Sequence, residues 1–241
     1  MRIQIVNPNS TVPMTEKIAA AARLAAAAGT EILAATSLAG PPSIQGYHDG
    51  ALALPGLLAE IGRGKSDGVG AHIIACFDDT GLDAARSLAS APVIGIGEAG
   101  YHLASLIAAR FSVVTTLSCS IPILEDNLRR YGLAARCVRV RASDVPVLAL
   151  EEPGSDARRR ISAEIATAIA EDRAEAIVLG CAGMADLAAA LAREHGIPVV
   201  DGVAAAVKLA ESLVSLGLST SKSGGWAFPH AKGSSVSPVD K

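Results

Sequence analysis

Apolar runs alternate along the chain with alanine-rich segments in which apolar positions recur at helical spacing. The apolar runs predict strands at Arg2–Val6, Glu31–Thr36, Val69–Ala75, Val93–Gly95, Phe111–Thr115, Arg136–Arg141, Ala176–Leu179 and Pro198–Val200. The alanine-rich segments predict helices at Met14–Ala28, Ala51–Ile61, Asp83–Ser90, Ala99–Ala109, Ile121–Tyr131, Asp156–Asp172, Ala185–His195 and Val203–Leu216. Strands that alternate with helices are typical of a parallel sheet covered by helices, so the pattern predicts an α/β fold.

The order of these elements repeats once. "RIQIV" leads into the polar turn "NPNST" and "RFSVV" into "TTLSCS", and later in each half an apolar run reaches a cysteine before a strand that begins with proline. Cys76 and Pro92 are 16 positions apart, and Cys181 and Pro198 are 17 apart. The similar intervals predict two similar α/β lobes, residues 1–96 and 97–202. Residues 219–241 are rich in Ser, Gly, Lys and Pro and predict a flexible tail, in which "GWAFPH" offers an anchor.

Composition narrows the class of protein. The 241 residues are 50% hydrophobic and 3% aromatic, which predicts a core of Ala, Val, Ile and Leu. A net charge of −3, no long basic run and few aromatic rings argue against nucleic-acid binding. No apolar stretch is long enough for a membrane span, and the first residues enter a strand directly, so we expect a cytoplasmic protein. The four cysteines lack CxxC spacing, which argues against disulfides and a zinc site.

Two of the cysteines lie at equivalent points of the repeat. Cys76 and Cys181 each follow a predicted strand and precede small residues and a helix, whereas we interpret Cys119 and Cys137 as small apolar side chains. Ligands bind beyond the carboxyl ends of strands in open parallel sheets, so we expect the first two thiols to share a cleft between the lobes. Backbone N–H groups and a helix dipole there predict thiol pKa values lowered from about 8.5.

Two thiols that face each other suit one chemistry. To invert a stereocentre next to a carbonyl, one group removes the proton from one face while the other donates a proton to the opposite face. The enolate oxygen formed between these steps needs hydrogen-bond donors. We predict that the N–H groups of Phe77, Asp78, Ala182 and Gly183 supply them.

The polar turns allow two interpretations. "NPNS" could be a turn that caps a helix, or the Asn7 amide could contact a substrate, and its place at the end of the first strand favours contact. Thr115 and Thr116 hold the matching place in the second half. The loop "GPPSIQGYHDG" is either an ordinary connection or a substrate lid that contains Ser43, Ile44 and Tyr47.

Three further features have structural interpretations. "GIGEAG" at residues 95–100 lacks the spacing of a dinucleotide-binding turn and predicts a tight connection from strand to helix. His72 predicts a packed histidine, because it precedes Cys76 by four residues in a predicted strand and therefore lies more than roughly 10 Å from that thiol. Asp78 and Asp79 are candidates to cap the helix that follows them.

Taken together, "NPNST", "GPPSIQ", "ACFDDTGLDAAR", the turn at Val114–Thr116 and "VLGCAGM" resemble the hydantoin racemases of the aspartate/glutamate racemase superfamily. The resemblance runs from Arg2 to about Leu216. It implies two pseudo-twofold-related lobes, each a parallel sheet flanked by helices, with the active site in the interlobe cleft. It also implies that a C-terminal helix at about residues 203–218 completes the first lobe, and that the enzyme is a homo-oligomer.

The resemblance further implies racemisation without a cofactor or metal, with Cys76 and Cys181 as the acid/base thiols. Asn7, Thr115 and Thr116 would contact the ring amides. No Arg or Lys lies beside either cysteine in the sequence, which favours a neutral cyclic ureide, namely a 5-monosubstituted hydantoin. Allantoin is a close alternative. A relative that acts on an amino acid or a small diacid by racemisation, isomerisation or decarboxylation stays open, as does a binding protein without catalysis.

Overall fold

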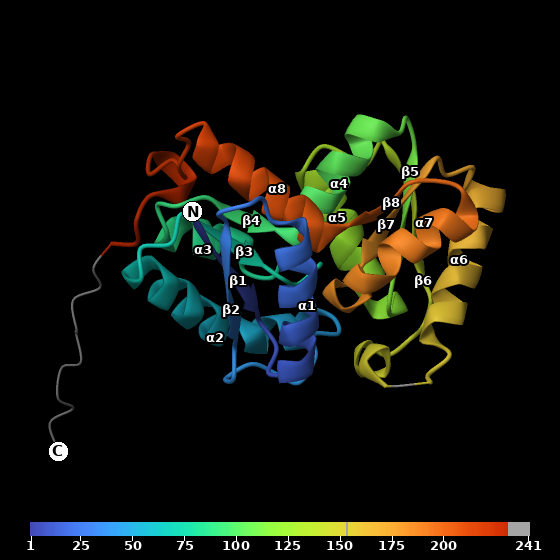
Figure 1. Ribbon diagram of the computed structural model, residues 1–241, viewed down its shortest axis with the longest axis horizontal. Coiled ribbons are helices and arrows are strands. Elements are labelled where there is room, and N and C mark those ends of the chain that lie inside the picture. Colours follow the sequence, from blue (N-terminus) through green and yellow to red (C-terminus); the bar gives the residue numbers. More distant parts are fainter. Residues whose placement is uncertain (153, 231–241) are drawn as a thin grey trace, which may run out of the picture.

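Two parallel four-stranded sheets form the framework of residues 1–152 and 154–230, the part that the computed structural model describes (Figure 1). The first sheet has the order β2-β1-β3-β4, with β1 at Arg2–Asn7, β2 at Glu31–Thr36, β3 at Ala71–Ile74 and β4 at Val93–Gly95. The second has the order β6-β5-β7-β8, with β5 at Phe111–Thr115, β6 at Cys137–Ala142, β7 at Ala176–Gly180 and β8 at Val199–Asp201. The shared strand order confirms the predicted α/β class and two-lobed arrangement.

Helices flank both sheets. They are α1 (Val12–Ala25), α2 (Tyr47–Ser66), α3 (Leu82–Leu88), α4 (Ile96–Ile107), α5 (Ile121–Arg130), α6 (Ala157–Asp172), α7 (Ala188–His195) and α8 (Gly202–Ser215). Short 3₁₀ turns add η1 (Ser118–Ser120), η2 (Val147–Glu151), η3 (Ala182–Leu187) and η4 (Gly224–Trp226). The helix α2 differs most from prediction, because it begins at Tyr47, four residues early, and ends at Ser66, five residues late. Gly46 has a φ of 97°, and the Asp49 carboxylate accepts the Gln45 N–H at 3.0 Å, so the turn closes four residues early.

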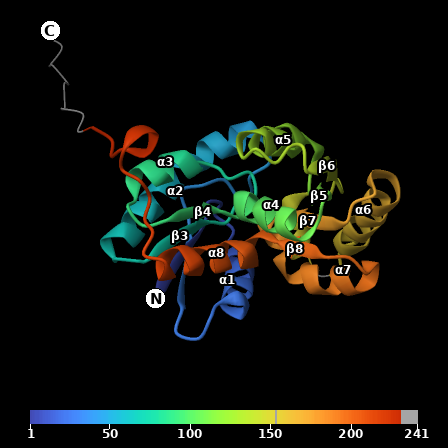
Figure 2. The same ribbon diagram turned by 90° about the horizontal axis from the view of Figure 1, so that it is seen from above.

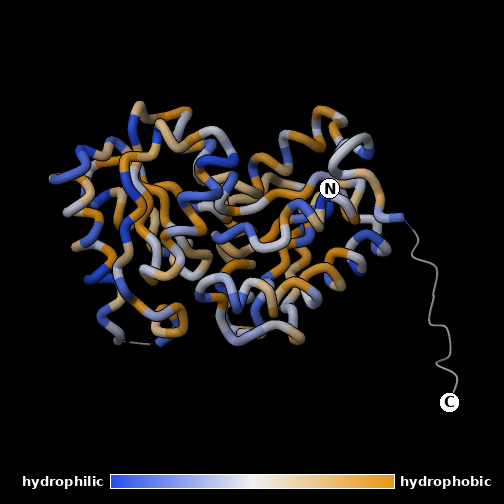
Figure 3. Tube along the Cα trace, turned by 180° about the vertical axis from the view of Figure 1, so that it is seen from behind, coloured by the Kyte–Doolittle hydropathy of each residue, from blue (hydrophilic) through white to orange (hydrophobic). Residues whose placement is uncertain are grey.

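The central strands are the best-buried elements. Every residue of β3, β5 and β7 is buried, whereas the edge strand β2 is mostly exposed or half-buried. Helices cover both faces of each sheet, so the central strands need no polar face. Figure 3 shows the resulting concentration of hydrophobic segments in the interior of each lobe.

The last helix of each half packs on the opposite sheet. The helix α4 follows β4 but packs on β7, and α8 follows β8 but packs on β3, β4 and α1 (Figures 1 and 2). The two helices also lie side by side, and one core cluster includes Ile5 and Ile73 of the first sheet with Val178 of the second and Val203 of α8. The exchange therefore joins the lobes through a shared core.

The segment after α8 lies against the first lobe. The Thr220 N–H donates to the Ser90 carbonyl at 2.8 Å, and the Trp226 ring packs on the Arg86 guanidinium with 4.9 Å from Cζ to the ring centroid. Trp226 Nε1 also donates to Asp83 at 3.2 Å. Residues 220–226 of the expected tail thus contact the first lobe, and Trp226 of "GWAFPH" provides one of these contacts. Residues 231–241 of the expected tail lie outside the described residues.

Within the described ranges, no helix is both long and apolar enough to cross a membrane.

Candidate active site

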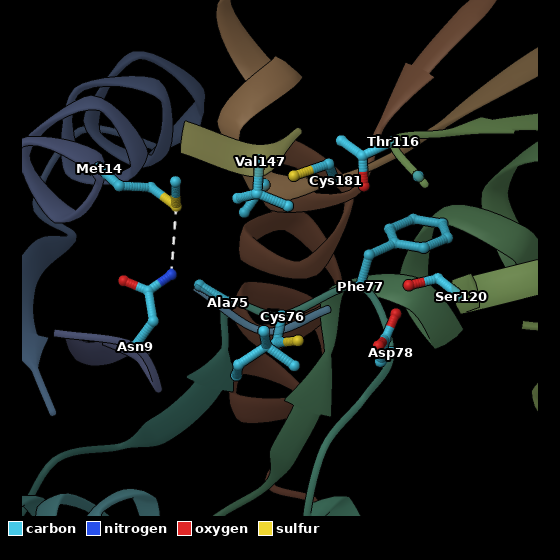
Figure 4. A pocket seen from close by; sticks show the side chains of 13 residues that line it. Asn9, Met14, Ala75, Cys76, Phe77, Asp78, Thr116, Ser120, Val147 and Cys181 are labelled. Carbon is cyan, nitrogen blue, oxygen red and sulfur yellow. Dashed lines mark hydrogen bonds between the residues drawn. The ribbon is translucent and has the colours of Figure 1, made fainter. Parts of the chain in front are cut away.

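Both cysteine loops leave their sheets at equivalent positions. Ile74 pairs with β1 and Leu179 with β5 at the matching register, and each is followed two positions later by a cysteine, Cys76 or Cys181. The two thiols approach a single cavity from opposite lobes, and Figure 4 shows one on each side of it. The cavity has a volume of about 30 Å³. Its lining consists of Asn9, Met14, Ile44, Ala75, Cys76, Phe77, Asp78, Thr116, Ser120, Val147, Gly180, Cys181 and Ala182.

Burial dominates the ionisation of both thiols. It raises the pKa of Cys76 far above the usual value, the Asp78 charge adds to this, and a hydrogen bond with the Thr80 hydroxyl at 3.6 Å opposes it. Burial also raises the pKa of Cys181 to about 12, with the Gly183 N–H opposing the shift. The predicted lowering of the thiol pKa values is therefore wrong. The α-helices that follow the two thiols, α3 and α7, begin at Leu82 and Ala188, too far along the chain to offset the desolvation.

Asp78 brings a carboxyl group into the cavity. The residue is half-buried, but its Oδ2 atom is fully buried and has no hydrogen-bond partner among the described residues. Burial raises the pKa of Asp78 to about 7. Its backbone carbonyl accepts a hydrogen bond from Asn127 Nδ2 at 2.9 Å, which fixes the Cys76 loop against α5 of the second lobe.

Asp79 ties the same loop to α4. Its carboxylate accepts the N–H groups of Gly97 at 2.9 Å and Glu98 at 2.7 Å, and the Tyr131 hydroxyl at 2.7 Å. The expected cap on α3 is wrong, because α3 has no side-chain cap and Asp79 caps the first turn of α4 instead. A Cβ on Gly95 would lie 2.0 Å from Asp79 Oδ1. The connection "GIGEAG" thus needs glycine so that the carboxylate can reach the helix.

The amide of Asn7 does not reach the cavity. The side chain is 1% exposed and donates to Asn9 Oδ1 at 2.8 Å and Thr15 Oγ1 at 3.0 Å, which organises the turn into α1. Asn9 lines the cavity instead, where it donates to Met14 Sδ at 3.3 Å (Figure 4). The "NPNS" turn therefore reaches the cavity two residues later than the sequence suggested.

In the second polar turn, one of the two predicted threonines borders the cavity. Thr115 Oγ1 donates to the Gly180 carbonyl at 2.9 Å and is buried away from the lining, whereas Thr116 borders the cavity. Ser120 of η1 joins it there, a residue that sequence reasoning missed. Phe77 and Ala182 line the cavity, whereas Gly183 is not part of the lining and its N–H group faces the Cys181 thiol.

The two lobes cover the cavity with equivalent loops. The connection after β2 places Ile44 in the lining, whereas Ser43 lies outside it and Tyr47 is 63% exposed at the start of α2. The connection after β6 contributes Val147 from η2, which sequence reasoning missed. The internal repeat indicates a role for Val147, because the connection after β6 is the counterpart of the connection after β2, which carries Ile44.

An ion pair connects η2 of the second lobe to α1 of the first lobe. Lys17 Nζ of α1 lies 3.0 Å from Glu151 Oε1 and donates to the Leu150 carbonyl at 3.0 Å. Both partners belong to η2, the turn that carries Val147. The pair therefore bridges the lobes beside the cavity.

Other polar groups in the described part of the chain do not form a metal centre. No group of three or more His, Cys, Asp or Glu side chains is arranged to hold a metal ion within residues 1–152 and 154–230. His72 is fully buried with Nδ1 2.7 Å from Gln4 Oε1, and burial lowers its pKa to about 4. It is the packed histidine that the strand pattern predicted.

Comparison with known proteins gives consistent matches. The family model for Asp/Glu/hydantoin racemases matches residues 3–210. Hydantoin racemase of Rhizobium meliloti is 50% identical, over 96% of both chains, and that of Pseudomonas sp. (strain NS671) is 45% identical, over 96% of this chain and 93% of the other. The structure of allantoin racemase from Klebsiella pneumoniae is 52% identical with a TM-score of 0.95, over 96% of this chain and 95% of the other.

Proposed function

The chain belongs to the Asp/Glu/hydantoin racemase family and is an enzyme of the racemase type, and from this premise we propose that it racemises 5-monosubstituted hydantoins. Cys76 and Cys181 act as the two acid/base groups at C5. One observation carries the proposal: the two thiols occupy equivalent positions in the two lobes and border one cavity from opposite sides. Arranged so, each thiol can reach one face of the same carbon.

The raised thiol pKa values fit this role. Two thiolates that face one buried cavity would repel each other, so one cysteine is a thiolate while the other keeps its proton. A thiolate with a raised pKa is scarcer at neutral pH but a stronger base, which suits removal of a proton from a weakly acidic carbon. The protonated thiol then delivers its proton to the opposite face, and the roles are exchanged for the other enantiomer.

The enolate that forms between the two proton transfers places negative charge on O4 of the ring. The N–H groups of Phe77 and Asp78 in one loop, and of Ala182 and Gly183 in the other, are the candidate donors. Every step uses the side chains and backbone of this chain, so the proposal includes no cofactor and no metal.

The lining favours a neutral ring over an anion. Asn9, Thr116 and Ser120 offer amide and hydroxyl groups, and no Arg or Lys borders the cavity among the described residues. A carboxylate brought into this cavity would lose its hydration without gaining a cationic partner. This supports a cyclic ureide rather than a free amino acid or a small diacid.

Allantoin is the second candidate substrate. It is itself a hydantoin with a ureido group at C5, and the 52% identity to an allantoin racemase structure favours it specifically. The cavity holds only about two water molecules at roughly 10–15 Å³ each, so Ile44 and Val147 have to move to admit either ring.

The test uses single enantiomers of hydantoins that carry methyl, benzyl or ureido groups at C5, incubated in D2O. We expect loss of optical rotation together with deuterium uptake at C5. Unchanged rotation across the whole panel would show the proposal to be wrong. Tight binding by calorimetry without turnover would instead identify a binding protein.

A further inference from the structure

Asp78 is a polar residue of the cavity lining that has no polar counterpart in the other cysteine loop. The corresponding position of the other cysteine loop is Gly183, so a carboxyl group enters the cavity from the first lobe only. Figure 4 shows this carboxyl group beside Ser120 and on the same side as Cys76. Its Oδ2 atom is buried and accepts no hydrogen bond from the described residues. A buried carboxylate oxygen without a donor is costly, which makes it a binding feature rather than a packing one.

The surroundings of Asp78 point to a donor from the ligand. The lining contains no Lys or Arg, and the nearby Lys17 is held by Glu151 and the Leu150 carbonyl. The hydrogen-bond donor to Asp78 must therefore be an N–H group of the ligand itself. A hydantoin ring carries two such groups, one on N1, which is bonded to C5, and one on N3, which is not.

Resting on the proposed function, we propose that the Asp78 carboxylate accepts the N1–H of the hydantoin ring and thereby selects neutral cyclic ureides over anions. C5 has to lie between the thiols, and Asp78 follows Cys76 by two residues, so the ring atom next to C5 is the one within its reach. The C4 carbonyl, on the other side of C5, is then directed toward the N–H groups of Ala182 and Gly183 rather than toward those of the Asp78 loop. The hydrogen bond thus fixes the rotation of the ring about C5, while the negative charge repels a carboxylate.

The first experiment changes the ligand and leaves the protein intact. The wild-type enzyme is given a 5-substituted hydantoin, its N1-methyl derivative and its N3-methyl derivative, and kcat/KM is measured for each. Loss of a hydrogen bond to a charged group predicts a decrease of about tenfold to a hundredfold for the N1-methyl compound. The N3-methyl compound is the matched control and should keep the parent rate within a few-fold.

The second experiment removes the acceptor. In Asp78→Ala the parent hydantoin should lose about tenfold to a hundredfold in kcat/KM, while the N1-methyl compound should lose little, so that the preference for the parent disappears. Asp126→Ala, which changes an exposed acid on α5, is the control and should keep the wild-type preference. A purely structural role of Asp78 would reduce both substrates equally.

The third measurement tests exclusion of anions. The ring-opened N-carbamoyl amino acid carries a carboxylate, and its inhibition constant is determined for the wild type and Asp78→Ala. Removal of a like charge predicts binding at least about tenfold tighter in the variant.

Two results would overturn the inference. Equal turnover of the parent and N1-methyl hydantoins by the wild type would exclude the N1–H contact, and this result needs no variant to fold. Equal losses of both compounds in Asp78→Ala would show that the carboxyl group acts elsewhere on the ring. A wild type that racemises no hydantoin would instead refute the proposed function, and the inference with it.

Discussion

The two cysteine loops occupy the same place in two lobes of the same topology, yet they surround their thiols with different groups. Cys76 is followed by a phenylalanine and two aspartates, whereas Cys181 is followed by alanine and glycine. Each thiol has a backbone N–H partner two residues further on, and both lie near the Asp78 carboxyl, but only Cys76 has a hydroxyl partner and only Cys181 lies near Lys17 and Glu151. The two loops therefore hold equivalent positions but surround their thiols with different chemical groups.

The different surroundings of the two thiols fit the asymmetry of the hydantoin ring that we propose as substrate. The two enantiomers place their C5 hydrogens on opposite faces, which two equivalent thiols can reach. The remaining ring atoms around C5 have no such symmetry, since N1 is a donor and C4 bears an acceptor. A binding group therefore needs to be on one side only, and Asp78 provides it in our proposal.

The largest effect is expected from breaking the pair of thiols. Cys76→Ser and Cys181→Ser should each lower racemisation by about 10²- to 10⁴-fold, because the hydroxyl is a poor acid/base group at neutral pH. Each variant should still exchange the C5 hydrogen of one enantiomer, and the two variants should prefer opposite enantiomers. Deuterium uptake followed by NMR on each pure enantiomer measures this. Cys119→Ser, at an exposed thiol of η1, is the control. Full racemisation by either catalytic variant would rule out the two-thiol mechanism.

The next effect concerns the hydrogen bonds that hold the Cys76 loop against α4 and Tyr131. Asp79→Asn turns an acceptor of two backbone N–H groups and one hydroxyl into a mixed donor and acceptor, so the free energy of unfolding should fall by about 2–3 kcal/mol. Tyr131→Phe removes only the hydroxyl bond and should cost about 1 kcal/mol. Urea denaturation measures both, with Tyr47→Phe at an exposed tyrosine as the control. Because the two side chains share one hydrogen bond, the double variant should lose less stability than the sum of both costs, and a fully additive loss would contradict this shared bond.

A smaller effect should appear in the pH dependence of stability. Burial raises the pKa of Asp78 to about 7 in the folded chain, so its stabilising contribution is present below the unfolded value near 4 and is lost as the pH rises through 7. Asp78→Asn should therefore be more stable than the wild type at pH 8 by about 1 kcal/mol or more, and the advantage should shrink at pH 5. Urea midpoints at the two pH values measure it. A constant difference between wild type and variant would contradict the expected ionisation.

The smallest effect tests the two covering loops. Ile44→Ala and Val147→Ala each enlarge the cavity from one lobe, so each should change the ratio of kcat/KM for benzyl and methyl hydantoins by roughly tenfold or less, in favour of benzyl. Leu148→Ala changes a more exposed side chain of η2 and should leave the ratio unaltered. A shift in only one of the two variants would show that the substituent lies under a single loop.

Much of the fold could be predicted from the sequence. All eight strands were found to within two residues at each end, the central ones because burial gives them continuous apolar runs, and the helices in between followed from alanine-rich periodicity. The start of α2 was missed because a single glycine with a positive φ begins the helix in a segment that resembles a loop. The site was predicted less completely: Cys76, Cys181, Ile44 and Thr116 do line one cavity, whereas Asn9, Ser120 and Val147 were not predicted.

The class of fold, the repeat and the placement of a thiol at the end of one strand in each half follow from local patterns along the chain. These features depend on local periodicity and spacing, which one chain displays directly. Packing between distant segments, in contrast, places Asn9 rather than Asn7 at the cavity, lets Asp79 cap α4 rather than α3, and raises the thiol pKa values. The direction of a side chain and the loss of its water depend on atoms from distant segments, including Tyr131 and Val147 of the other lobe, and no local pattern encodes them.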